Sequence, residues 1–148
     1  MPAIHAPQGS GALNQAFGLK RRTRIASEDV GGAFALWEEE VPAGAGPPLH
    51  IHGKEHEIFT VLSGQMRFVA DGVEHEVRPG DVMMIPPGMP HTFKALEDAV
   101  ALVQLMPGMA GGFFAAVTAA GVDPTTDMDR VRAIAADHNI SFVGPPLD

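Results

Sequence analysis

Hydrophobic and polar residues alternate over many short stretches between residues 19 and 106, and Gly and Pro separate these stretches. Alternation with a period of two is typical of strands that bury one face. The Asp71-Gly72 pair between two such stretches is typical of a tight hairpin turn. Strands this short and frequent favour an antiparallel sandwich or barrel. The strands predicted in this way are Leu19–Ala26, Ala33–Val41, His50–His52, Glu57–Leu62, Gln65–Ala70, Val73–Val77, Val82–Ile85, His91–Ala95 and Ala99–Met106.

The pattern changes on both sides of this region. No sustained period runs through the first 18 residues, which predicts a loosely ordered arm. After Pro107, the segment Gly111–Ala120 predicts a short helix that ends at Gly121. Thr126 is expected to cap a second helix. We therefore expect three parts: an arm at 1–18, a β-barrel at 19–106, and a helical extension at 107–148 that packs on the barrel.

Composition narrows the functional classes. The 148 residues have the size of one domain, and their net charge of −8 disfavours binding to nucleic acids or anionic membrane surfaces. The chain has no Cys, which excludes disulfides, thiolate catalysis and Cys-based zinc sites. It also shows no apolar run of membrane-spanning length and no signal-peptide core. We expect a cytoplasmic protein.

Histidines concentrate in the predicted barrel. His50 and His52 lie two residues apart on a predicted strand, so both imidazoles should point to one face and form a natural metal chelate. Glu57 has the same parity as Phe59 and Val61 on the next strand. A carboxylate on an apolar face costs several kcal/mol unless it is paired or metal-bound. Glu57 is therefore a candidate ligand or general base.

The other histidines are weaker candidates. The parity of His56 points it to the exterior, although a strand bulge could let it replace Glu57. His75 could face inward on its hairpin, but a partly exposed position is favoured. His5 and His138 are interpreted as surface residues.

Glycines, a proline and the candidate ligands form two spaced motifs: Gly44, His50, His52, Glu57 and Gly64 in the first, and Gly80, Pro86, Gly88 and His91 in the second. These motifs resemble those of the cupin superfamily, the first in full and most of the second. The interval of fifteen residues between them is similar to that of compact bacterial single-domain cupins. One departure is Ala95, where the family often has Asn, and that Asn is not a metal ligand.

The resemblance implies a jelly-roll barrel, or double-stranded β-helix, that holds one divalent metal ion. The ligands it implies are His50, His52, Glu57 and His91. Three imidazoles and a carboxylate suit Fe, Ni, Mn, Co, Cu or Zn, and the sequence does not choose among them. The resemblance also implies a homodimer that covers exposed strand edges.

A substrate pocket is expected on the apolar inner face. Lys and Arg are missing from the candidate inward positions, and Arg67 is predicted to point outward. A pocket without cations disfavours sugar phosphates and 2-oxoglutarate and favours an apolar or aromatic molecule. The candidate lining residues are Phe34, Leu36, Phe59, Val61, Met66, Phe68, Met84, Phe93 and Leu102, with Phe113 or Phe114 as further candidates.

Three hypotheses about function follow. Resemblance to quercetinase-like cupins implies a dioxygenase whose enol or phenol substrate binds the metal and gives its proton to Glu57. The second hypothesis is an isomerase, cyclase or lyase that uses the metal as a Lewis acid. The third is a non-enzymatic protein that binds a small molecule. The helix near Phe113 and Phe114 could form a lid, or it could simply pack on the barrel or form a dimer contact.

Overall fold

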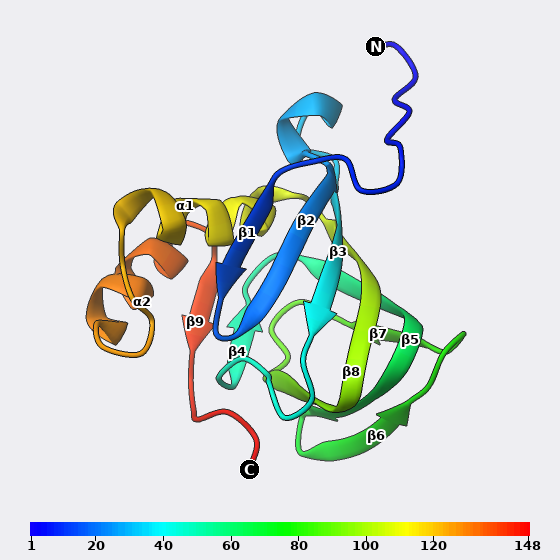
Figure 1. Ribbon diagram of the computed structural model, residues 1–148. Coiled ribbons are helices and arrows are strands. Elements are labelled where there is room, and N and C mark those ends of the chain that lie inside the picture. Colours follow the sequence, from blue (N-terminus) through cyan, green and yellow to red (C-terminus); the bar gives the residue numbers. More distant parts are fainter.

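Nine strands form one curled sheet, and two short α-helices lie near the C-terminus (Figure 1). The computed structural model describes all 148 residues. This confirms the predicted all-β fold with two C-terminal helices. The strands are β1 Leu13–Ala16, β2 Leu19–Ile25, β3 Ala35–Val41, β4 His50–His52, β5 His56–Ala70, β6 Val73–Val77, β7 Val82–Ile85, β8 His91–Met106 and β9 Ile140–Phe142. The helices are α1 Phe113–Ala120 and α2 Met128–Ala136, with single 3-10 turns at Ser27–Val30 and Met109–Gly112.

β8 is central to the sheet, because it pairs with β3, β4 and β5. The strand order is β1-β2-β3-β8-β4-β9, and β5, off this path, pairs with β8, β6 and β7. All these pairs are antiparallel. The curl encloses a core of 26 buried hydrophobic residues. None of the helices combines the length and the hydropathy needed to cross a membrane.

Each of the two longest strands, β5 and β8, joins two strands that the alternation predicted separately. Their pairing shifts register at several points between Val61 and Met66. Gly64 lies within this irregular stretch with a φ of 75°. A Cβ at this position would come within 2.2 Å of the carbonyl oxygen of Asp98, so only glycine fits. The Gly is a bend in a continuous strand and does not end it.

The N-terminal arm contains a strand, which corrects the prediction of loose order. β1 pairs with β2 through a turn at Phe17 and Gly18, where φ is 54° and 75°. Phe is rarely found in this left-handed conformation, so the sequence carried no hairpin signal there. In addition, the Arg24 guanidinium donates a hydrogen bond to the carbonyl of Ala6 at 2.7 Å.

The C-terminal extension contains a strand as well as the predicted helices. α1 ends at Gly121 in the left-handed conformation, as predicted. α2 is capped by Asp127, whose carboxylate accepts a hydrogen bond from the Arg130 N–H at 3.3 Å, and the predicted cap Thr126 is wrong. β9 was not predicted, and it pairs along all of β4. The extension therefore supports the strand that carries two of the predicted ligands.

Candidate metal centre and cavity

β4 holds His50 and His52 on its inner face. The strand has only three residues, and Ile51 between the two histidines points to the opposite face. β9 pairs with β4 along one edge, while His50 pairs with His91 of β8 on the other. This pairing brings two histidines that are 41 positions apart in sequence side by side, with ring centroids 4.3 Å apart.

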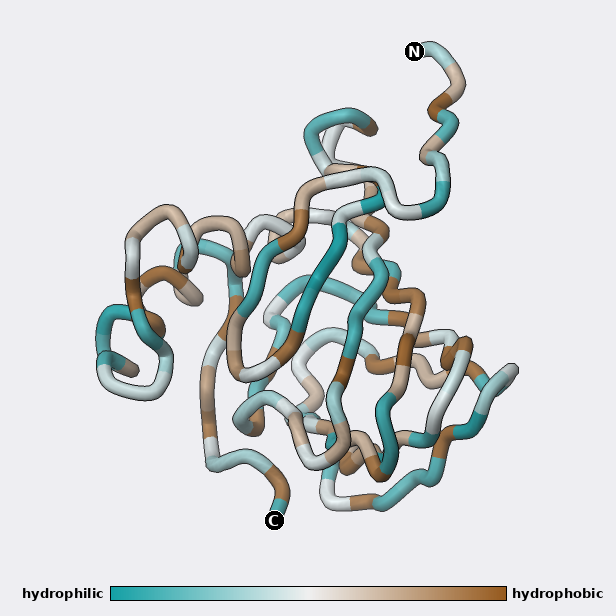
Figure 2. The backbone as a smooth tube through the Cα atoms, viewed as in Figure 1, coloured by the Kyte–Doolittle hydropathy of each residue, from teal (hydrophilic) through white to brown (hydrophobic).

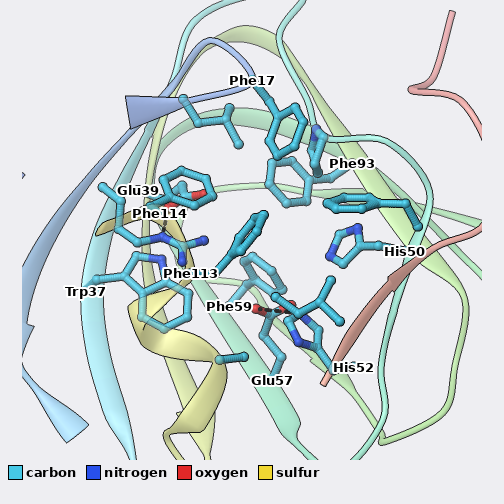
Figure 3. A pocket seen from close by; sticks show the side chains of 16 residues that line it. Phe17, Trp37, Glu39, His50, His52, Glu57, Phe59, Phe93, Phe113 and Phe114 are labelled. Atoms are coloured by element: carbon cyan, nitrogen blue, oxygen red, sulfur yellow. Dashed lines mark hydrogen bonds and ion pairs between the residues drawn. The ribbon is translucent and has the colours of Figure 1, made fainter. Parts of the chain in front are cut away.

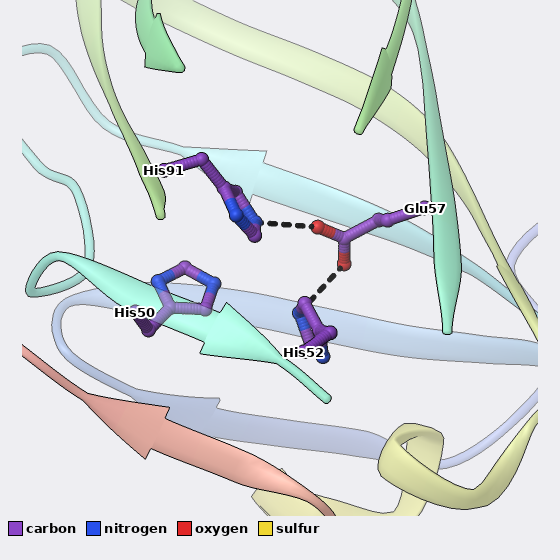
Figure 4. Close-up of side chains that lie close together, drawn as sticks. All are labelled: His50, His52, Glu57 and His91. Carbon is purple, nitrogen blue, oxygen red and sulfur yellow. Dashed lines mark hydrogen bonds and ion pairs between the residues drawn. The ribbon is translucent and has the colours of Figure 1, made fainter. Parts of the chain in front are cut away.

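Glu57 completes a compact group of four side chains (Figure 4). The possible ligand atoms of His50, His52, Glu57 and His91 all lie within 4.8 Å of one another, and all four side chains are buried. The Glu57 carboxylate lies 3.2 Å from His91 Nε2 and 3.5 Å from His52 Nε2. The four residues that the cupin resemblance pointed to are therefore brought together.

Hydrogen bonds to the backbone orient two of the imidazoles. His50 Nδ1 donates to the carbonyl of Pro48 at 2.8 Å, and His91 Nδ1 donates to that of Met89 at 2.9 Å. A proton on Nδ1 leaves the lone pair of Nε2 free to bind a metal, which is the usual support for metal-ligating histidines. His52 Nδ1 is buried without any partner. The donor set and these supports fit one divalent metal ion.

Burial and the charges of neighbouring side chains shift the pKa values of His50 and Glu57. Burial lowers the pKa of His50 well below its usual value, and the neighbouring charges of His91 and His52 lower it further. Burial alone would raise the pKa of Glu57. The charge and hydrogen bonds of His52, with those of His91, outweigh burial and hold the pKa of Glu57 well below its usual range. An ionised carboxylate and a neutral imidazole are the forms that bind metals.

The remaining histidines lie outside this group. His56 and His75 are exposed, as expected, and so is His5. His138 is half-buried, where a surface position was expected, because its ring packs against Phe113 and its Nδ1 donates to the carbonyl of Ile134.

A narrow cavity of about 40 Å³ opens beside the candidate ligands (Figure 3). This volume holds a few water molecules. Aromatic rings form most of its wall, and Phe113 and Phe114 of α1 contribute two of them. The lining residues are Phe17, Leu19, Arg21, Trp37, Glu39, Pro47, His50, His52, Glu57, Phe59, Phe93, Ala110, Phe113, Phe114, Ile140 and Phe142.

The side chains expected to line a substrate pocket lie in different places around this cavity. Of the nine expected side chains, Phe59 and Phe93 line the cavity. Three others fill the core behind it: Val61, Met66 and Phe68. The other four do not face the cavity, because the alternate residues of their segments point inward. Phe34, Leu36 and Leu102 are half-buried, and Met84 is 50% exposed. On β3 the inward residues are Ala35, Trp37, Glu39 and Val41.

The expectation of a cation-free pocket is wrong, because Arg21 lines the cavity. Its Nε donates to the carboxylate of Glu39 at 3.0 Å, across the paired strands β2 and β3. Both side chains are almost buried, with 12% and 3% of their surfaces exposed. β2 is hydrophilic over most of its length (Figure 2), so Arg21 resembled its basic neighbours in the sequence. Glu39 did carry a signal, because it shares the parity of Trp37 and Val41.

Burial also shifts the pKa of Glu39. It raises the pKa of this carboxyl group, and the Arg21 charge and hydrogen bond, which lower the pKa, do not cancel the effect. The charge of Glu57 raises it further. The two carboxylates therefore interact electrostatically although they belong to separate polar groups.

Comparison with known proteins agrees with this geometry. Residues 37–106 match the model of the cupin domain family. The chain is 31% identical over 94 residues to quercetin 2,3-dioxygenase of Bacillus subtilis, covering 63% of this chain and 28% of that protein. Among solved structures, KdgF from Halomonas is similar, with a TM-score of 0.64 and 18% identity over 72% of this chain and 94% of that one. A predicted oxalate decarboxylase from Thermotoga maritima has a TM-score of 0.61 and 19% identity over 72% of this chain and 99% of that one.

These matches differ in extent. The chain spans less than half the length of the curated relatives it matches. The structural neighbours, at below 20% identity, share the fold. The matched segment contains all four residues of the candidate metal centre and both motifs that the sequence carries. Residues 37–106 of this chain are therefore a cupin domain.

Proposed function

We propose that this chain is a metal-dependent oxygenase that acts on a small aromatic enol or phenol. The observation that carries the proposal is the group of four donor atoms within 4.8 Å at one side of an aromatic cavity. The similarity to quercetin 2,3-dioxygenase supports the reaction class. The small cavity favours a substrate of no more than one ring, and even one ring requires the aromatic wall to move outward.

His50, His52, Glu57 and His91 would hold the metal. A redox-active ion bound there supplies Lewis acidity and electron transfer to oxygen. Glu57, which the neighbouring imidazoles keep ionised, accepts the proton of the substrate hydroxyl group. Phe59 and Phe93 contact the ring and exclude water from it.

The test is oxygen consumption with small catechols and phenols by the metal-loaded protein. We expect turnover in the wild type and a loss of the order of 10²–10⁴-fold in Glu57→Gln at equal metal content. His56→Gln is the matched control, because its side chain is exposed beside Glu57, and it should retain wild-type turnover. Equal turnover in Glu57→Gln would contradict the assignment of Glu57 as the base.

A second candidate function is a metal-assisted isomerase, cyclase or lyase. One observation favours it: two buried carboxyl groups, those of Glu57 and Glu39, line the same cavity. A site with a second carboxyl group besides the candidate ligand suits proton transfer to and from a substrate without oxygen. This candidate predicts turnover without oxygen and activity with zinc, whereas the oxygenase requires oxygen and a redox-active metal.

A further inference from the structure

The Arg21–Glu39 pair has hydrogen-bonding capacity that the protein does not use. Arg21 Nε binds the Glu39 carboxylate, but neither Nη atom makes a hydrogen bond within the chain. The indole Nε1 of Trp37 is also buried, near the Glu39 carboxylate but without a hydrogen bond of normal geometry, and only 2% of the residue is exposed. A buried N–H group without a good acceptor is destabilising. All three residues line the cavity.

The guanidinium group is held in place before any ligand arrives. Its central carbon lies 4.0 Å from the centroid of the Trp37 ring and 3.8 Å from that of the Phe114 ring. Stacking on two aromatic faces and the cross-strand bond to Glu39 restrict its rotamers. A fixed donor loses little entropy when a ligand binds.

The charge of this polar group selects what it can bind. Glu39 neutralises Arg21, so a ligand carboxylate or phosphate would meet a buried negative charge at the same point. A hydroxyl group avoids this repulsion, since it can accept from the Arg21 and Trp37 N–H groups and donate to the Glu39 carboxylate. The aromatic walls between this group and the candidate metal centre suit an apolar ring.

We propose that Arg21, Trp37 and Glu39 bind a neutral hydroxyl group of a small aromatic ligand whose opposite end reaches the His50/His52/Glu57/His91 cluster. Figure 3 shows Trp37 and Glu39 on one side of the cavity and His50 on the other. The proposal deepens the proposed function and rests on it only for the metal-facing end of the ligand. Arg21 and Glu39 are assigned here as specificity-determining residues.

The test compares two probes that share a catechol end, which would chelate the metal, and differ in one group at the other end: 3,4-dihydroxybenzyl alcohol and 3,4-dihydroxybenzoate. Calorimetry measures their affinities for the metal-loaded protein without oxygen, and the fluorescence of Trp37, the single tryptophan of the chain, reports occupancy of the cavity. The wild type should bind the alcohol about 10-fold more tightly, because the carboxylate meets Glu39. Glu39→Gln leaves Arg21 without its counter-charge and should reverse this preference.

The matched control is Glu38→Gln. Glu38 pairs with Arg24 on the same two strands and does not line the cavity, so this variant should keep the wild-type preference. If Glu39→Gln does not fold, the variant Arg21→Met/Glu39→Gln removes both charges and should bind the two probes with equal affinity. An unchanged preference in the folded variants, or no binding of either probe to the wild type, would overturn the proposal. Because no step requires turnover, a protein that consumes no oxygen can still pass this test.

Discussion

Glu57 and Glu39 are both buried and both line one cavity, yet their pKa values shift in opposite directions. Loss of water raises the pKa of each. Glu57 lies among imidazoles that hydrogen-bond to both of its oxygens, and their combined effect exceeds that of burial. Glu39 has one guanidinium partner, bound through one nitrogen, and burial prevails. The number and placement of partners, more than depth in the core, decide which form of a buried carboxylate is stable.

The two polar groups also differ in origin. His50, His52, Glu57 and His91 all lie within residues 37–106, the segment that matches the cupin domain. Arg21 comes from β2 and its stacking partner Phe114 from α1, both outside that segment. One side of the cavity is therefore built from the cupin domain itself, while the other depends on the flanking segments of this chain.

The largest expected effect is on metal content. His50→Ala/His52→Ala removes two of the four donors, so metal content should fall from about one equivalent to below about a tenth. Elemental analysis of the purified untagged protein measures it. His56→Ala should retain the metal, because that side chain is exposed. Equal metal content in the double variant would show that the His50/His52/Glu57/His91 cluster is no more a metal site than the Arg21–Glu39 pair.

The next largest expected effect is on the free energy of unfolding, through the buried Arg21–Glu39 ion pair. Arg21→Met leaves Glu39 buried and unpaired, which should lower the free energy of unfolding by about 3 kcal/mol. Arg21→Met/Glu39→Leu removes both charges and should recover most of this loss. Urea unfolding measures both, with Arg24→Met, in a more exposed pair, expected to cost less than about 1 kcal/mol. A double variant less stable than the single one would refute the ion-pair explanation.

The pH dependence of stability should separate the two carboxylates in the metal-free protein. Folding lowers the pKa of Glu57, so the stability it contributes is present above the ordinary value of 4.5 and is lost as pH falls. Folding raises the pKa of Glu39, so its contribution is present below 4.5 and is lost as pH rises. Thermal unfolding of the wild type, Glu57→Gln and Glu39→Gln across pH measures both. The two wild-type-minus-variant differences should slope in opposite directions, and parallel slopes would contradict the assignment.

The smallest expected effect concerns the stacking on Arg21. Phe114→Leu removes the ring that lies 3.8 Å from the guanidinium and should cost about 1 kcal/mol more than Phe93→Leu. Both rings are buried and line the cavity, but Phe93 faces no guanidinium. Urea unfolding of the two variants measures the difference. Equal losses in the free energy of unfolding would show that stacking on Arg21 contributes nothing to stability.

Parity along the strands pointed to part of the candidate metal centre, and the cupin resemblance implied His91 as the fourth residue. His50 and His52 had to share a face, and Glu57 was notable as a carboxylate among apolar neighbours. The same argument applied to Glu39 between Trp37 and Val41 would have predicted the second buried carboxylate. Its partner Arg21 was hidden because β2 carries other basic residues at both parities.

On β3 the choice of Leu36 was wrong although parity was informative, because Glu38 and Glu40 share its face and Trp37 and Val41 mark the other face as the inward one. Parity itself failed on β8, where both faces are apolar and Leu102 lies between Ala101 and Val103. The packing of the large Trp37 ring and the pairing of β3 with β8 decide the inward face, and both are properties of the whole sheet.

Two short strands, β1 and β9, were also missed. β1 has four residues and β9 has three, so neither has a period long enough to recognise. Each exists because its backbone pairs with another strand, and for β9 that strand lies about 90 positions earlier in the chain.

The pairing of β4 with β9 has a consequence for synthesis of the protein. His50 and His52 leave the ribosome long before Ile140–Phe142, which complete the hydrogen bonding of their strand. During that interval the nascent chain presents two histidines on a strand that lacks one of its edges. The strand that carries two of the candidate ligands therefore gains its second paired edge only after residues 140–142 have been synthesised.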